Sequence, residues 1–276
     1  MLRPLPAKLA LVLVLVVGLC AGLGLLGGPV ASTAEARPLA EVRKAGILRV
    51  GVNPNFPPMS SYGKTNQLEG FDVDVANALA RALGVRLQLV PTATAQRIPF
   101  LTAGRIDASL GALTITPERR QLVDYTMPLH TETMSVLVTD RVRANSWRDL
   151  DRPDVTLVNM RGNTSVALLK EKVPRAKLLL VDGNADTVRA MAQGRADAMI
   201  ENIDFFWRYT RAFPNVQWRR LPDPILTKEC GIGVAKGNET LRAALDAELR
   251  KLHADGTVGK LWEKWYGVPM TVPVKL

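Results

Sequence analysis

The amino-acid sequence predicts an α/β fold made of two lobes that face one another across a cleft. Strand-like segments alternate with helix-like segments, which is typical of α/β folds with largely parallel sheets. The alternation occurs in two series, and they meet near residues 137–139. We therefore expect two mixed, mainly parallel sheets flanked by helices. Ligands of such sheets bind beyond the carboxyl ends of the strands, where the loops of both lobes would converge.

Each series is defined by hydrophobic periodicity and by the residues that end its elements. In the helix predicted over residues 71–83, for example, apolar residues recur at helical spacing and Gly84 follows. The first series consists of a strand over 47–52, a helix over 71–83, a strand over 85–90, a helix over 98–103 and a strand over 106–113. The second consists of a strand over 155–159, a helix over 165–171, a strand over 177–181, a helix over 187–193 and a strand over 196–200.

The chain begins with the three-part pattern of a secretory signal peptide, over residues 1–36. A positively charged start precedes an apolar run over residues 9–26, and small residues follow. Cleavage after Ala34 or Ala36 fits, because each has a small residue three positions earlier. An uncleaved anchor is the alternative, since the apolar run approaches the roughly 20 residues that span a bilayer. We expect a periplasmic protein, with a membrane-anchored form as that alternative.

Composition indicates a globular body behind the signal. About 240 residues remain, which is enough for one large or two medium domains with proper cores. The chain has a formal net charge of +10, but its lysines and arginines are scattered among acids. We therefore expect no nucleic-acid partner, because such partners select concentrated basic patches. Cys230 is the only cysteine after the signal, so this part of the chain has no internal disulfide.

Residues 111–119 form the most informative stretch, a strand end followed by a strong helix start. Thr116 is a good N-cap and Pro117 suits the first helical position. The N–H groups at a helix N-terminus favour an anion, and Arg119 can grip a carboxylate with two charge-assisted bonds. Thr114 adds a hydroxyl donor. The alternative is a capped helix whose arginine is merely solvated.

Further motifs surround this stretch in a fixed order. They are Gly70-Phe71-Asp72, Arg97-Ile98-Pro99, Gly104-Arg105-Ile106-Asp107, Asp124-Tyr125, Arg161-Gly162-Asn163-Thr164, Gly194-Arg195-Ala196-Asp197-Ala198 and Tyr266-Gly267. In this order and spacing they closely resemble the polar amino-acid-binding proteins of bacterial ABC transporters. The resemblance covers nearly the whole chain after the signal.

The resemblance implies the type II periplasmic-binding-protein fold, in which two lobes close on the ligand by a hinge motion. The first lobe would comprise residues 37–133 and 232–276, and the second would comprise residues 134–231. The resemblance also implies that the ligand α-carboxylate binds a group of residues from both lobes. These residues are Arg119, Thr114, the backbone around Ala112, and Thr164.

Phe56 and Phe71 match positions whose aromatic rings enclose the ligand side chain in the family, and core aromatics are the alternative interpretation of both. Arg97 matches the arginine that pairs with a second carboxylate in relatives selecting aspartate or glutamate. Asn53 offers no acidic partner for a basic ligand. These features favour an acidic or polar amino acid as the ligand, and a surface helix residue is the alternative interpretation of Arg97.

One position departs from the family pattern. The family places an aspartate shortly after the Gly-Arg-x-Asp-Ala strand, where it neutralises the ligand ammonium, and the matching residue here is Asn202. A neutral asparagine cannot cancel a charge that is taken out of water, and an unpaired buried ion is costly. We expect Glu201 or Asp204 to supply the charge. The alternative is a ligand that is not a standard α-amino acid.

The resemblance implies a solute-binding protein that captures an amino acid and delivers it to an ABC transporter permease. We expect a monomer without metal or cofactor, and not an enzyme, because His130 and His253 stand alone and no serine or cysteine lies in a nucleophile elbow. The alternative is a cyclohexadienyl dehydratase acting on prephenate or arogenate, an activity that the same fold hosts. Glu201 would then be the acid over the leaving group.

Overall fold

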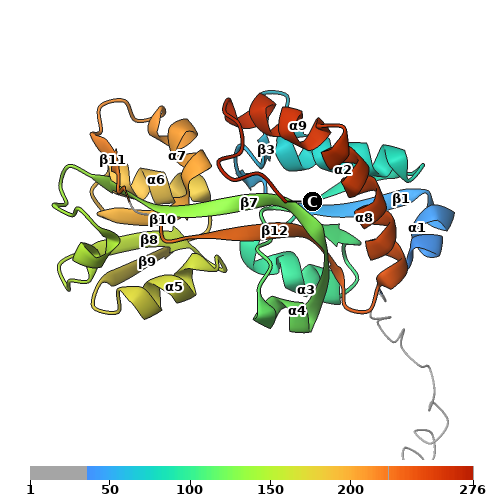
Figure 1. Cartoon of the computed structure of the whole chain (residues 1–276), viewed down its shortest axis with the longest axis horizontal. Helices are drawn as coiled ribbons and strands as arrows, with labels where there is room; N and C mark the ends of the chain where they lie inside the picture. The colour runs from blue at the N-terminus through green and yellow to red at the C-terminus, as the bar shows by residue number, and fades with distance from the viewer. Residues whose placement is uncertain (1–35, 223, 276) are drawn as a thin grey trace, which may run out of the picture. The chain divides into compact units, whose positions relative to one another are not determined.

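The structure is a computed structural model that describes residues 36–222 and 224–275, so the predicted signal lies outside it except for Ala36. Figure 1 shows the course of the chain. The strands are β1 (Ile47–Val52), β2 (Asn55–Phe56), β3 (Ser60–Tyr62), β4 (Leu68–Glu69), β5 (Arg86–Pro91), β6 (Ala108–Ser109), β7 (Val123–Thr139), β8 (Thr156–Met160), β9 (Lys177–Val181), β10 (Ala198–Asn202), β11 (Trp218–Arg220) and β12 (Leu226–Ala235). The α-helices are α1 (Leu39–Ala45), α2 (Phe71–Ala82), α3 (Arg97–Thr102), α4 (Pro117–Leu122), α5 (Ser165–Lys172), α6 (Asn184–Ala192), α7 (Ile203–Thr210), α8 (Glu239–Ala254) and α9 (Thr257–Tyr266).

The predicted α/β fold is confirmed, and its two sets of parallel strands are joined into one curled sheet. The strand order is β5-β1-β6-β12-β7-β10-β8-β9, with β11 paired to β7. β1 is parallel to β5 and β6, and β8 is parallel to β9 and β10. The long antiparallel strands β7 and β12 lie between these two sets and run from one to the other (Figure 1). They are the two crossings that connect the lobes.

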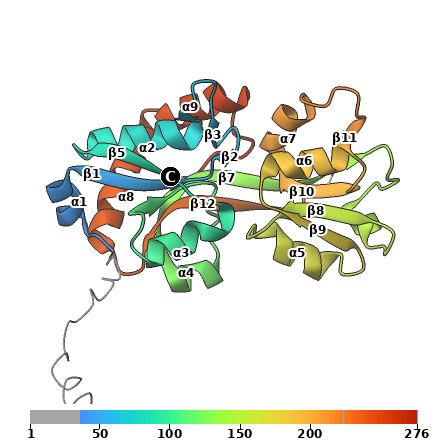
Figure 2. The same ribbon diagram turned by 180° about the vertical axis from the view of Figure 1, so that it is seen from behind.

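Helices cover both faces of each strand set, as Figures 1 and 2 show from opposite sides. In the first set, α2 packs on β1 and β5, whereas α3 packs near β6 and β12. In the second set, α6 and α7 lie on one face and α5 lies on the other. Parallel strands that are covered on both faces read as apolar runs in the sequence, which is why their positions could be predicted.

Most predicted elements agree with the structure to within a few residues, but the strand predicted over 106–113 does not. Only Ala108 and Ser109 pair as β6. Gly111 and Ala112 follow with φ of 85° and 54°, and this left-handed backbone turns the chain away from the sheet. The apolar run continues through the turn because its side chains remain buried, so the sequence pattern overstates the length of the strand.

The C-terminal segment after α9 reaches the second lobe. The backbone N–H and the hydroxyl of Thr271 both donate to the carboxylate of Asp204 in the first turn of α7. The hydroxyl of Thr131 on β7 donates to the carbonyl of Val272. The last residues, predicted to belong to the first lobe, therefore also contact the second.

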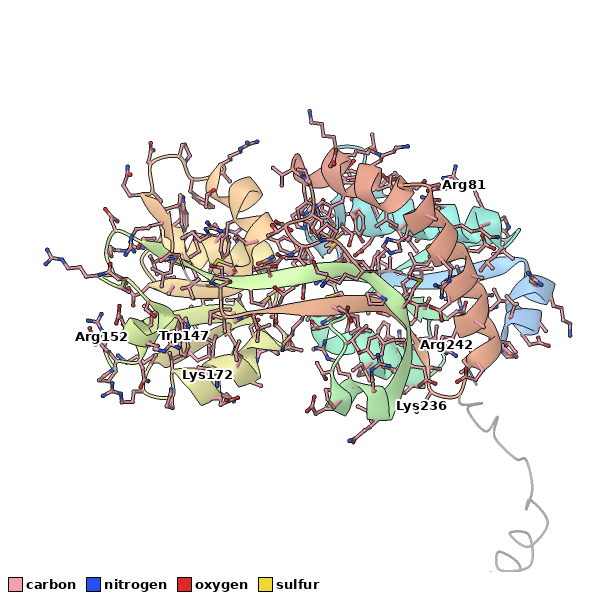
Figure 3. All side chains as sticks on the ribbon, in the orientation of Figure 1. Arg81, Trp147, Arg152, Lys172, Lys236 and Arg242 are labelled. Carbon is pink, nitrogen blue, oxygen red and sulfur yellow. The ribbon has the colours of Figure 1, made fainter. Side chains whose placement is uncertain are left out.

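Positively charged side chains are spread over the surface of both lobes. Figure 3 labels Arg152 and Lys172 on the second lobe, and Arg81, Lys236 and Arg242 on the first. Several have acidic partners, such as Asp124 for Lys236 at 2.7 Å. In residues 36–222 and 224–275, no helix is both long and apolar enough to span a membrane.

Truncation of a core leucine should destabilise the fold far more than truncation of an exposed one. Leu79 on α2 is 1% exposed and packs in the main core, so Leu79→Ala should lower the free energy of unfolding by about 2–5 kcal/mol. Leu122 at the end of α4 is 53% exposed, and Leu122→Ala should change it by less than about 0.5 kcal/mol. Equilibrium denaturation by urea would measure both, and equal losses would contradict this packing.

Candidate functional site

A small cavity lies where the two lobes meet, and residues from both lobes line it. The lining residues are Phe56, Thr94, Arg97, Gly111, Ala112, Thr114, Glu132, Met160, Asn163 and Thr164. Five of the residues predicted for the site are in this set, namely Phe56, Arg97, Ala112, Thr114 and Thr164. The structure thus brings together residues that are more than 100 positions apart in the chain.

The predicted helix start at residues 116–119 forms as expected. The hydroxyl of Thr116 accepts a hydrogen bond from the backbone N–H of Arg119 at 3.3 Å, and Pro117 is the first residue of α4. This cap sets the direction of the Arg119 side chain. Its guanidinium donates through Nη1 to the carbonyl of Thr114 at 3.2 Å and through Nη2 to the carbonyl of Gly162 at 3.0 Å. Arg119 therefore links the two lobes next to Thr114, although Arg119 is not itself one of the cavity-lining residues.

Two threonine hydroxyls meet from opposite lobes beside Arg119. Oγ1 of Thr114 lies 3.5 Å from Oγ1 of Thr164. Thr164 directly precedes α5 and Thr114 follows the turn at residues 111–112. Hydroxyls and a guanidinium that converge in this way suit a planar carboxylate, because both kinds of group can donate to its oxygens.

Glu132 on β7 also lines the cavity, and it is not among the residues predicted from the sequence. Its Oε2 accepts a hydrogen bond from Oγ1 of Thr114 at 3.3 Å. A signal was present, since Glu132 is the only acidic residue between Tyr125 and Thr139 in a strand that is otherwise apolar or uncharged. Acidic residues are rarely fully buried without a partner, so an acid in such a strand indicates a polar site.

The turn at Gly111 and Ala112 is held by two buried ionisable side chains. Oδ2 of Asp72 accepts a hydrogen bond from the backbone N–H of Gly111 at 2.9 Å. Nη1 of Arg97 donates to the carbonyl of Gly111 and, at 3.1 Å, to the carbonyl of Ala112, while its Nε donates to the carbonyl of Thr94 at 3.0 Å. Arg97 is 4% exposed, so it is not a surface helix residue. It positions the backbone that lines the cavity, and Nη2 is the nitrogen left for other partners.

Burial changes the protonation of this group of charged residues. It raises the pKa of Asp72 to about 8, and it lowers the pKa of Arg97 to about 10. It also raises the pKa of Glu132, against the opposing effects of the Cys230 thiol, Arg97 and Thr114. Burial and the nearby charge of Glu132 raise the pKa of Glu201 to about 8. The guanidinium of Arg97 stays charged at neutral pH, whereas the carboxyl groups bind protons more readily than usual.

The two predicted aromatic residues have different surroundings. Phe56 lines the cavity and stacks on Phe205 of α7, with ring centroids 4.7 Å apart and an interplanar angle of 11°. Phe71 does not line it. Phe71 is fully buried and packs edge-on against Trp262 and His130. Of its two sequence interpretations, the structure matches the core aromatic.

The residues predicted for the ligand ammonium lie around the cavity rather than in it. Asn202 is fully buried, and its Oδ1 accepts a bond from the backbone N–H of Asp204 at 3.2 Å. The carboxylate of Asp204 is bound by Thr271, away from the cavity-lining residues. Glu201 is closer, because its Oε2 accepts a bond at 3.4 Å from Nδ2 of Asn163, which lines the cavity.

Asn53 lies directly behind the cavity and not on its surface. Its Nδ2 donates to Oγ1 of Thr94 at 2.8 Å, and its Oδ1 accepts from the backbone N–H of Asn55 at 3.0 Å. Asn53 therefore holds the cavity-lining Thr94 and the start of β2, and both ends of its amide already have partners.

The chain is similar along most of its length to known solute-binding proteins. The family model of the bacterial extracellular solute-binding proteins, family 3, matches residues 48–268. The ABC transporter glutamine-binding protein GlnH of Bacillus subtilis is 30% identical over 204 residues, which are 73% of this chain and 74% of GlnH. The L-cystine-binding protein TcyJ of Escherichia coli is 28% identical over 268 residues, which are 95% of this chain and 96% of TcyJ.

Solved structures share the fold. The crystal structure of the ancestral amino acid-binding protein AncCDT-1, a precursor of cyclohexadienyl dehydratase, superposes with a TM-score of 0.77 at 35% identity and covers 83% of this chain and 99% of its own. The chain therefore belongs to family 3 of the bacterial extracellular solute-binding proteins, and relatives such as GlnH and TcyJ are amino-acid-binding proteins.

The contact between the lobes at Gly162 should not tolerate a side chain. Gly162 has a φ of 79°, and an added Cβ would lie 3.0 Å from Cα of Ala95 in the first lobe. Gly237 has nearly the same φ, 77°, but open space around it, so Gly237→Ala is a matched control for backbone strain of about 1–2 kcal/mol.

We expect Gly162→Ala to lower the free energy of unfolding by more than Gly237→Ala does, because only Gly162 adds a tight contact with Ala95 to the backbone strain. Equilibrium denaturation by urea would measure both variants, and equal losses would contradict this contact.

Proposed function

We propose that this chain captures a polar amino acid outside the cytoplasmic membrane and delivers it to the permease of an ABC transporter. The observation that carries the proposal is the meeting of Thr114 and Thr164 from the two lobes at one cavity, with the guanidinium of Arg119 bonded to the backbone of Thr114 and Gly162 beside it. A ligand carboxylate at this point would contact both lobes at once. Its binding would therefore stabilise their contact, which is how a two-lobed binding protein couples capture to closure.

The carboxylate end of the ligand is assigned to Arg119, with the two hydroxyls beside it. The guanidinium now donates to the carbonyls of Thr114 and Gly162, which are neutral acceptors. A carboxylate would accept stronger, charge-assisted bonds from the same nitrogens. It would thus compete well for Arg119 without leaving a buried donor unpaired.

The side chain of the ligand would lie against the ring of Phe56, which its stack on Phe205 holds in place. An acidic side chain, the preference expected from Arg97, has less support from this geometry. Nε and Nη1 of Arg97 are engaged by backbone carbonyls, so a bidentate grip on a second carboxylate would cost those bonds. Glu132 in the same cavity would also repel it. We therefore favour a neutral polar amino acid over aspartate or glutamate.

The location and partner follow from the family and from the sequence of residues 1–36. Members are extracellular proteins by description, and the charged start, apolar run and small residues of this segment fit export to the periplasm. An ABC permease is the partner implied by the relatives. A monomer is sufficient for this role, because both halves of the cavity come from one chain.

The proposal predicts ligand-specific thermal stabilisation that depends on Arg119. Each of the twenty common L-amino acids should be tested by thermal denaturation, and at a concentration 100 times Kd the ligand would stabilise the protein by about 2.7 kcal/mol. Neutral polar amino acids should give the largest shifts.

Arg119→Ala should abolish the shift, whereas Arg120→Ala should keep it, because the neighbouring guanidinium lies over the ring of Tyr125 instead. A full shift in Arg119→Ala would exclude the proposed carboxylate site. A shift with aspartate or glutamate alone would restore the acidic preference.

A cyclohexadienyl dehydratase is the second candidate, and one observation favours it. Glu201 is close to the cavity and, with a pKa of about 8, is mostly protonated at neutral pH, as a general acid must be. However, Asn163 stands between Glu201 and the cavity, which places the acid away from a leaving group.

We expect no dehydratase activity. Prephenate or arogenate incubated with the protein should give no phenylpyruvate or phenylalanine above the uncatalysed rate, followed by ultraviolet absorbance. Product formation that Glu201→Gln abolishes would establish the enzyme instead.

A further inference from the structure

A binding protein for α-amino acids must neutralise the ligand ammonium, and the family's position for this acid holds Asn202. We propose that the carboxyl group of Glu132 on β7 accepts hydrogen bonds from the ligand ammonium, and that Glu201 on β10 forms a pair of carboxyl groups with it. Binding of the ammonium then releases a proton from this pair. This inference rests on the proposed function, because it concerns the other end of the same ligand.

The distances from Thr114 to Glu132 and to Thr164 place the carboxyl group of Glu132 next to the expected position of the ligand ammonium. Thr114 Oγ1, a proposed donor to the ligand carboxylate, is 3.3 Å from Oε2 of Glu132 and 3.5 Å from Oγ1 of Thr164. Standard bond lengths put the nitrogen of an α-amino acid about 3 Å from its nearer carboxylate oxygen. A ligand whose carboxylate contacts Thr114 therefore has its ammonium within reach of Glu132.

The other acids near the cavity are less suitable. Asp204 is bound by Thr271, and Asp72 is bound by the backbone of Gly111. Glu201 does not line the cavity, but it contacts Asn163, which does. It is also within electrostatic range of Glu132, since the charge of Glu132 raises the pKa of Glu201. Two coupled carboxyl groups titrate as a pair, so the proton is shared between them.

The charged surroundings of the pair limit how much negative charge it holds. The titratable or charged groups around it are Arg97 on α3, Arg119 on α4, Asp72 on α2, and Cys230 and Lys228 on β12. Burial disfavours the ionised carboxyl, and mutual repulsion disfavours a second charge. At neutral pH the pair therefore retains a proton. An ammonium placed beside it favours the ionised form, and the proton passes to the solvent.

The sign of the pH dependence follows from this exchange. Below the pKa of the pair, binding requires loss of a proton, so the apparent affinity rises with pH by up to about tenfold per unit for one proton. Above the pKa the affinity levels off. With the pKa of Glu201 at about 8, the rise should cover the range from pH 6 to pH 8. An acid of ordinary pKa at position 202 would give no such dependence in this range.

The test uses thermal denaturation of the full chain with and without an equimolar mixture of the twenty common L-amino acids, at pH 6, 7 and 8. In the wild type the shift caused by the mixture should grow with pH. Glu132→Gln should reduce the apparent affinity at pH 8 at least tenfold and remove its pH dependence. Glu229→Gln, which removes an exposed carboxylate from the neighbouring strand β12, should behave as the wild type.

A rescue variant separates a binding role of Glu132 from a structural one. Glu132→Gln combined with Asn202→Asp returns an acid to the family position and should regain binding. If Glu132→Gln does not fold, Glu201→Gln decides, because it removes the second carboxyl group of the pair and should flatten the pH profile.

A Glu132→Gln protein that keeps the wild-type shift and pH profile overturns the inference, and so does an unchanged profile in Glu201→Gln. A wild type with no shift at any pH overturns the proposed function itself, and this inference with it.

Discussion

The interaction on which the site depends is the clamp of Arg97 and Asp72 on the turn at Gly111 and Ala112. Buried charges are stable only where hydrogen bonds and opposite charges compensate them, and here the backbone of the turn supplies most of the bonds. The clamp fixes Ala112 in a left-handed conformation and carries the chain from β6 to Thr114. Thr114 and the helix start at Thr116 then set the position of Arg119. The carboxylate end of the site is thus built from one chain segment and its two buried partners.

The fold gives this segment its function because β7 and β12 run through both lobes. Their pairing joins two strand sets that would otherwise be separate, and it leaves the loops at the strand ends facing each other. Thr164 and Gly162 reach Arg119 from the second lobe by this arrangement. Besides connecting the lobes, β7 contributes a side chain to the cavity. Glu132 on this crossing strand places a carboxylate between the two halves of the cavity, where a positive group of a ligand would meet it.

The sequence predicted the parts of the site that depend on local chemistry. The cap at Thr116 and the alternation of strands with helices follow from residue type and spacing, and the structure contains both. The prediction was less complete where burial decides the role. From the sequence, Phe71 and Phe56 have the same two interpretations, as aromatic residues of the site or of the core. Only the packing of Phe71 on Trp262 shows that Phe71 belongs to the core. Glu132 was missed because a lone acid in an otherwise uncharged strand indicates a polar site without showing which cavity or ligand it faces.

The central claim is that a ligand's carboxylate and ammonium are divided between Arg119 and Glu132. The most direct measurement is a crystal structure of the protein with the amino acid that stabilises it most. The account predicts the α-carboxylate within hydrogen-bond distance of Arg119, Thr114 and Thr164, and the ammonium about 3 Å from the carboxylate of Glu132. An ammonium bound at Asn202, with Glu132 still bonded only to protein groups, would contradict it.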